Sequence, residues 1–156
     1  MKKKKILRPA LIVLLSALLL LQLWRPARNV SAVPGPNDIN VRHPVPAPVL
    51  SVLQRACYDC HSNHTRYPWY AEVQPVRAWL DYHVNDGKRH LDFSAFGTYS
   101  AKRAGKKLDE IIDEVETRAM PLRSYTWMHV EARLTPTEIK LLAAWAADLR
   151  DEVSPP

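Results

Sequence analysis

The sequence contains almost no signal for β structure. No segment alternates β-branched and polar residues with a period of two, and no internal repeat is visible. Four segments instead carry apolar residues at helical spacing, near residues 49–56, from 68 or 75 to 83, 108–115 and 136–149. The sequence therefore predicts an all-α domain, which at this size buries only a modest core.

Each expected helix has a boundary signal. The first runs directly into Cys57, and the second is expected to stop at the turn signal Asn85-Asp86-Gly87. The third is expected to end before Met120-Pro121, because a residue before proline is driven out of the helical region. The fourth opens with Thr135-Pro136-Thr137-Glu138, a capping box with proline in the first turn.

Acidic residues are absent from the first thirty positions. This stretch holds seven of the 22 lysines and arginines and none of the 16 aspartates and glutamates. Four lysines precede an apolar run from Ala10 to Trp24, and two arginines close it. We interpret residues 1–30 as a signal-anchor, a single transmembrane helix in the cytoplasmic membrane with its lysines in the cytoplasm and the remainder facing the periplasm. The alternative is a signal peptide cleaved near Val30-Ser31-Ala32, which would give a periplasmic or secreted protein.

The rest of the chain has no excess of basic charge. After residue 30 there remain 15 basic residues against 16 acidic ones, so the positive charge belongs to the N-terminal segment and argues against a nucleic-acid partner. Residues 31–48 are rich in proline and show no hydrophobic period. This composition predicts a stiff linker that holds a domain of residues 49–152 clear of the bilayer.

Cysteine is scarce, since Cys57 and Cys60 are the only two, and His61 follows directly. A disulfide across so short a loop would stabilise the fold little. A thiol–disulfide oxidoreductase typically places its C-x-x-C where a strand meets a helix, and this chain lacks that setting. A structural zinc site usually needs a second close pair of ligands, and none follows at the usual spacing. A zinc-binding module therefore stays a weak alternative.

The pentapeptide C-x-x-C-H is the attachment signature of c-type haem. Within a helical turn, Cys57 and Cys60 can form thioethers to the two haem vinyl groups, while His61 binds the iron as the proximal ligand. Covalent attachment of haem takes place outside the bacterial cytoplasm, which agrees with the N-terminal segment. Covalent haem is therefore favoured over a disulfide, a redox dithiol and a zinc site.

The similarity to haem proteins extends beyond the pentapeptide. Four blocks in this order, CYDCHSNHTRYPWY, QPVRAWLDYHVNDGKRHLDFSAF, MPLRSYTWMHVEARLT and TEIKLLAAW, resemble the haem-binding-domain family of bacterial monohaem c-type cytochromes. The resemblance covers roughly residues 49–150. It implies a small cytochrome c-like helical domain around one covalent haem c. The family pattern usually has a second proline after Met-Pro, where this chain has Leu122.

The second side of the iron is specified less strongly. Met120 is the favoured distal ligand, because a Met-Pro pair at a helix end presents a thioether from a rigid loop. The alternatives are His129 and His83, either of which would give a bis-histidine iron of lower potential, and then Met128 and His64.

Three further expectations concern the surroundings of the haem. Trp69 and Trp79 are expected to wall its pocket. The ring N–H of His61 is expected to donate to a backbone carbonyl near Pro68. The basic run over residues 102–107 is either a solvated helix face or a docking patch for an acidic redox partner.

These observations favour a membrane-anchored cytochrome that binds haem and transfers single electrons on the outer face of the cytoplasmic membrane to unidentified redox partners. No catalytic residues are expected, because the haem carries the chemistry. The main alternative is a haem-based sensor or small-ligand (gas) binding protein with an open sixth iron site. A peroxidase is the least favoured, since no distal catalytic pair is evident.

Overall fold

The computed structural model describes residues 2–154, with the side chains of residues 7–154. The side chains of the four N-terminal lysines lie outside this part. All regular elements in the described part are helical, so the all-α prediction is confirmed. In chain order the elements are α1 (Lys2–Leu21), α2 (Ile39–Arg42), α3 (Ala47–Ala56), α4 (Tyr58–His61), η1 (Trp69–Glu72), α5 (Val76–His90), η2 (Phe93–Thr98), α6 (Ala101–Glu116), α7 (Arg123–Met128), η3 (Val130–Ala132) and α8 (Pro136–Val153).

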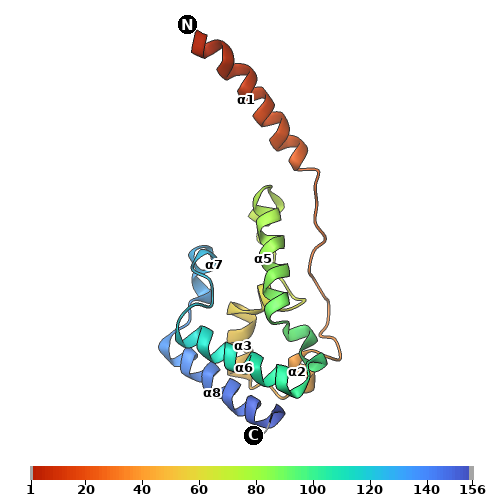
Figure 1. Cartoon of the computed structure of the whole chain (residues 1–156), viewed down its shortest axis with the longest axis vertical. Coiled ribbons are helices and arrows are strands. Elements are labelled where there is room, and N and C mark those ends of the chain that lie inside the picture. The colour runs from red at the N-terminus through yellow and green to blue at the C-terminus, as the bar shows by residue number, and fades with distance from the viewer. Residues whose placement is uncertain (1, 155–156) are drawn as a thin grey trace.

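Helices α6 and α8 pack along one another and form the base of the domain (Figure 1). Both present an apolar face to the core, in which Leu108 of α6 and Leu142 of α8 are fully buried. Helix α3 adds Leu53, and η2 adds Phe93 and Phe96. From this base, α5 and α7 rise as two arms toward the end of the molecule at which α1 lies (Figure 1).

Three of the four helices predicted from periodicity occur where they were expected. Helix α8 begins with the predicted capping box. The Thr135 hydroxyl accepts from the backbone N–H of Glu138, and the Glu138 carboxylate accepts from the backbone N–H of Thr135. Helix α5 differs, because it continues to His90 through the turn signal at Asn85-Asp86-Gly87. Gly87 is a packing residue within the helix and does not end it.

The segment predicted as a linker, residues 31–48, contributes to the core of the domain. Ile39 within it is fully buried in the core, and the buried Asp38 caps α2 by accepting from the backbone N–H of Asn40. Upstream of α2, Ser31 N donates to Asn63 O at 2.7 Å. The proline-rich segment therefore packs along the domain, because it contributes one large apolar side chain and several polar anchors.

Helix α1 extends away from the domain (Figure 1). Its described side chains, residues 7–21, are exposed and mainly apolar. Within the described residues, no helix has the combination of length and apolar character needed to cross a membrane.

Candidate functional site

A cavity of about 560 Å³ opens among α3, α4, α5, α6, α7 and α8. Cys57, Cys60 and His61 all line it, and so do Met120 and His83. Its volume lies within the range of about 300–1,000 Å³ found for ligand pockets in proteins. The folded chain thus brings the C-x-x-C-H turn and residues far downstream to one enclosed space.

The C-x-x-C-H segment forms a short helical turn just after α3. Cys57 breaks α3 with φ −124° and ψ −40°, and His61 N then donates to Cys57 O at 3.0 Å. Tyr58 anchors the turn in the core, with its ring 5.4 Å from that of Phe93. The two thiols are free. Both cysteines and the following histidine therefore face the cavity from a turn that is fixed at its buried side.

The His61 ring is oriented by the backbone. Its Nδ1 lies 3.0 Å from Leu91 O, and since a carbonyl only accepts, Nδ1 carries the proton. The sequence led us to expect this partner to be a carbonyl near Pro68, and that expectation is wrong. The extension of α5 to His90 places the Leu91 carbonyl next to the ring instead. Burial lowers the pKa of His61, opposed by this backbone bond. The neutral ring is left with Nε2 as a free electron-pair donor, which suits a metal ligand.

Burial also keeps both thiols protonated. It raises the pKa of Cys57 to about 12, with the neighbouring Cys60 adding to the effect. The pKa of Cys60 rises to about 11, again chiefly through burial and then through the charge of Asp59. Neither residue has the lowered pKa of a redox-active dithiol.

Helix α5 approaches the cysteine turn closely at Gly87. A Cβ built on Gly87 would lie 2.6 Å from Cys60 O and 3.1 Å from Cys60 Cβ. Only glycine permits this contact without a shift of the backbone. The contact explains how α5 brings the Leu91 carbonyl into reach of His61.

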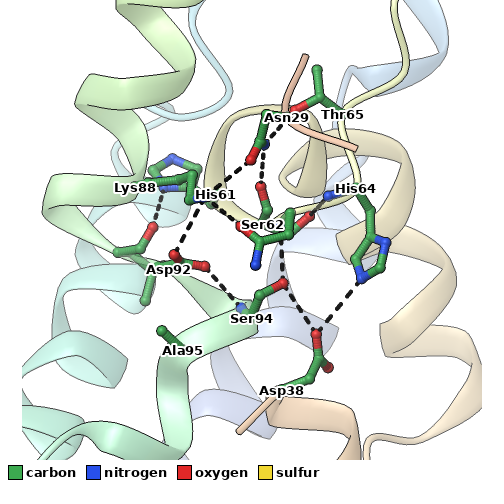
Figure 2. A network of polar contacts seen from close by, with 12 residues as sticks. Asn29, Asp38, His61, Ser62, His64, Thr65, Lys88, Asp92, Ser94 and Ala95 are labelled. Atoms are coloured by element: carbon green, nitrogen blue, oxygen red, sulfur yellow. Dashed lines mark hydrogen bonds and ion pairs between the residues drawn. The ribbon is translucent and has the colours of Figure 1, made fainter. Parts of the chain in front are cut away.

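A polar network fixes the loop that follows His61 (Figure 2). Asn29 Nδ2 donates to Ser62 O at 2.6 Å and to Thr65 Oγ1 at 2.8 Å. Lys88 of α5 donates to Asn29 Oδ1 at 3.0 Å. Residue 29, in the N-terminal segment, thus joins α5 to the loop that follows His61.

His64 belongs to this network and does not line the cysteine cavity. Its Nδ1 donates to Ser31 O at 3.1 Å, and its Nε2 lies 4.0 Å from Asp38 Oδ2 (Figure 2). It lines a different cavity, of about 590 Å³, together with Asp38 and Tyr58. As a distal ligand it is therefore poorly placed.

The other distal candidates divide into two groups. Met120 and His83 line the cysteine cavity, whereas His129 is not among its lining residues. His129 Nε2 lies 2.6 Å from the hydroxyl of Tyr70, and its ring stacks on Tyr125 at 4.3 Å. Met128 is exposed on α7. The structure thus keeps Met120 and His83 as the candidates that share a cavity with His61.

The expectation that Trp69 and Trp79 wall the pocket is corrected. Neither is among the lining residues, and their exposed fractions are 81% and 46%. Trp69 lies on η1, and the Trp79 ring contacts that of His83, which does line the cavity, with centroids 4.2 Å apart and planes tilted by 49°. The apolar and aromatic part of the lining instead includes Leu53, Phe93, Ile111, Val115 and Tyr125.

The basic run of α6 is not a continuous exposed face. Lys107 turns into the cavity lining and binds Glu110 at 2.5 Å. Arg103 lies over the Tyr99 ring at 4.2 Å. Lys102, Arg103 and Lys106 remain exposed, so only Lys107 leaves the basic face.

A buried carboxylate joins the cysteine turn to α7. Asp59, between the two cysteines, is 6% exposed and lines the cavity. It accepts from Arg66 N at 2.9 Å, from the Arg66 guanidinium at 3.1 Å and from Tyr125 OH at 2.6 Å. Burial and this bond raise the pKa of Tyr125, so the phenol stays protonated as a donor. The bond ties α7, which follows Met120, to the cysteine turn.

Several lining residues carry charge and gave no distinctive sequence signal. They are His90, Asp86, Lys107, Glu110 and Glu114. Each lies on α5 or α6, where the pattern predicts a solvated face, so only the fold, which brings both helices to one cavity, reveals them. Among the described residues, no three His, Cys, Asp or Glu side chains cluster closely enough to hold a metal ion by themselves.

Comparison with protein families gives one match. The family described as haem-binding domain matches residues 16–148. The chain belongs to this haem-binding-domain family. No curated protein and no solved structure matches it.

The residues of this haem-binding domain fit the group. The cavity holds two thiols three residues apart, a neutral imidazole oriented through Nδ1, and large apolar side chains such as Leu53, Phe93 and Leu142. Cys57 and Cys60 would bind the haem edge, and His61 would bind the iron. Met120 or His83 is available for the other side.

Proposed function

We propose that this haem-binding protein is a membrane-anchored monohaem c-type cytochrome that transfers single electrons on the outer, periplasmic face of the cytoplasmic membrane. The observation that carries the proposal is the oriented His61 beside two cysteines in a cavity that Met120 also lines. Bound haem would supply the electron transfer, and the protein would attach it, orient the proximal imidazole and limit solvent access. No group of the chain needs to act on a substrate.

The proposed anchoring is supported by α1. Its described side chains are exposed and mainly apolar, and its N-terminal end carries four lysines. Such a segment favours a bilayer with the basic end in the cytoplasm. Co-sedimentation of the full chain with lipid vesicles that survives high salt supports the anchoring, and release by salt contradicts it.

Covalent attachment is tested with the cysteines. When the protein is produced with a haem-maturation system, we expect haem to remain on the wild-type chain in denaturing electrophoresis. Cys57→Ser with Cys60→Ser should leave no haem stain at this mass, because no thioether can form. Equal staining of the double variant would refute the attachment, and the exposed Ser51→Ala serves as the matched control.

The distal ligand is tested with Met120→Ala. The oxidised wild-type protein should show the weak far-red band of iron–methionine ligation, and the variant should lose it while keeping its haem. A far-red band that persists in the variant would contradict the assignment and indicate another methionine, whereas a wild-type spectrum without this band would favour His83. Immediate binding of carbon monoxide to the reduced wild-type protein would favour the sensor or gas-binding alternative.

A further inference from the structure

Large apolar side chains are exposed on η1 and α7. Trp69 and Trp127 have exposed fractions of 81% and 79%, Met128 of 58% and Val73, just after η1, of 46%. We call these four residues the tryptophan edge. Exposed apolar side chains that gather in one place commonly mark an interaction surface.

The contacts of Tyr70 and His129 make the edge one surface. The Trp69 ring packs edge-on against that of Tyr70, with centroids 5.9 Å apart. The Tyr70 hydroxyl reaches His129 Nε2 at 2.6 Å, and His129 directly follows Met128. The end of α7 is therefore held beside η1.

The same surface holds the end of α1. Gln74 is buried, its N–H donates to Gln22 Oε1 at 2.9 Å, and its side-chain amide donates to Trp24 O at 2.8 Å. Arg25 bonds Glu72 O at 3.0 Å. In Figure 1 the N-terminal end of α5 lies near the end of α1. The apolar helix thus leaves the domain beside the tryptophan edge.

We propose that the tryptophan edge lies in the headgroup region of the bilayer that holds α1. Tryptophan favours this region because its ring is apolar while its N–H remains hydrated. Arg25 and Arg28 flank Glu72 and are half exposed, which suits anionic lipid headgroups. This inference rests on the proposed anchoring by α1. It gives the haem cavity, lined by α5 and α7, a fixed orientation relative to the membrane.

The edge is tested by photolabelling of the full-length, haem-loaded protein in vesicles of phosphatidylcholine and phosphatidylglycerol. A phospholipid with a photoactivatable group near its glycerol is included, and tryptic peptides are mapped by mass spectrometry. We expect adducts on peptides 67–77 and 124–133, several-fold above those on peptide 108–118 of α6. The double variant Trp69→Ser with Trp127→Ser should form fewer adducts on peptides 67–77 and 124–133 than the wild type, while its haem spectrum is unchanged.

Three outcomes would overturn the inference. Adducts confined to α1 would show that the protein is anchored but that its edge faces water, which leaves the proposed function intact. Failure of the chain to sediment with vesicles would refute both the anchoring by α1 and the membrane contact of the edge. Covalent haem attachment is tested independently of both by haem staining. If a chemical cross-linker added in place of the lipid probe joins two chains through peptides 67–77 and 124–133, the edge would instead be a contact with a second copy.

Discussion

Replacement of Asp59 by alanine should lower the free energy of unfolding by about 3 kcal/mol. The Asp59 carboxylate is nearly inaccessible to solvent and accepts hydrogen bonds from Arg66 and Tyr125. Alanine removes all of these bonds and leaves the partly buried Tyr125 hydroxyl without this acceptor. Because Arg66 is half exposed and regains water when released, the loss should lie at the lower end of that seen for buried ion pairs. Chemical denaturation of the haem-loaded protein, followed by circular dichroism, measures it.

A double-mutant cycle separates the Tyr125 bond from the loss of charge. Tyr125→Phe should lower stability by about 1–2 kcal/mol, since it removes one hydrogen bond to a charged group. The double variant should then be more stable than the sum of the two losses predicts, by about 1.5 kcal/mol. Additive losses would contradict the tether between the cysteine turn and α7. Tyr82→Phe, on the exposed side of α5, is the matched control and should change little.

Much of the proximal side of the site could be predicted from the sequence. The C-x-x-C-H spacing specifies two thiols and an imidazole on one turn, and the structure places all three along one cavity. The helices carrying the core also follow from periodicity, as α6 and α8 show. These features are local, so a single segment contains the information for each.

The features that depend on contacts between distant segments could not be predicted in this way. The partner of His61 is Leu91, thirty residues downstream, and it is set by the length of α5. The sequence Asn85-Asp86-Gly87 has the composition of a turn, yet the packing of α5 on α4 stabilises it as helix. Local propensity is a weak influence that tertiary packing overrides. The linker differs for the same reason, because burial of Ile39 outweighs the tendency of proline to keep a chain extended.

Gly87 offers the sharpest test of this packing. In a helix interior, alanine is favoured over glycine by about 1 kcal/mol, so Gly→Ala alone should stabilise. At Gly87, however, the added Cβ meets the Cys60 carbonyl oxygen at 2.6 Å, and a backbone atom cannot turn aside. Such overpacking costs about 1–3 kcal/mol and more in the tightest cases, so Gly87→Ala should destabilise by about 1–2 kcal/mol net.

Gly105→Ala on α6 is the matched control for Gly87→Ala. Its added Cβ would meet Ser154 Cβ at 2.8 Å and Ser154 Oγ at 3.1 Å, so relief requires a shift of this one C-cap residue of α8 and not of the cysteine turn. We therefore expect Gly105→Ala to lower stability less than Gly87→Ala does and to leave haem staining unchanged. Thermal unfolding of the two haem-loaded variants beside the wild type gives the comparison, and haem staining per chain reports whether the cysteine turn still accepts its cofactor. Equal melting temperatures for the two variants would contradict the close approach of α5 to the cysteine turn, and with it the means by which Leu91 orients His61.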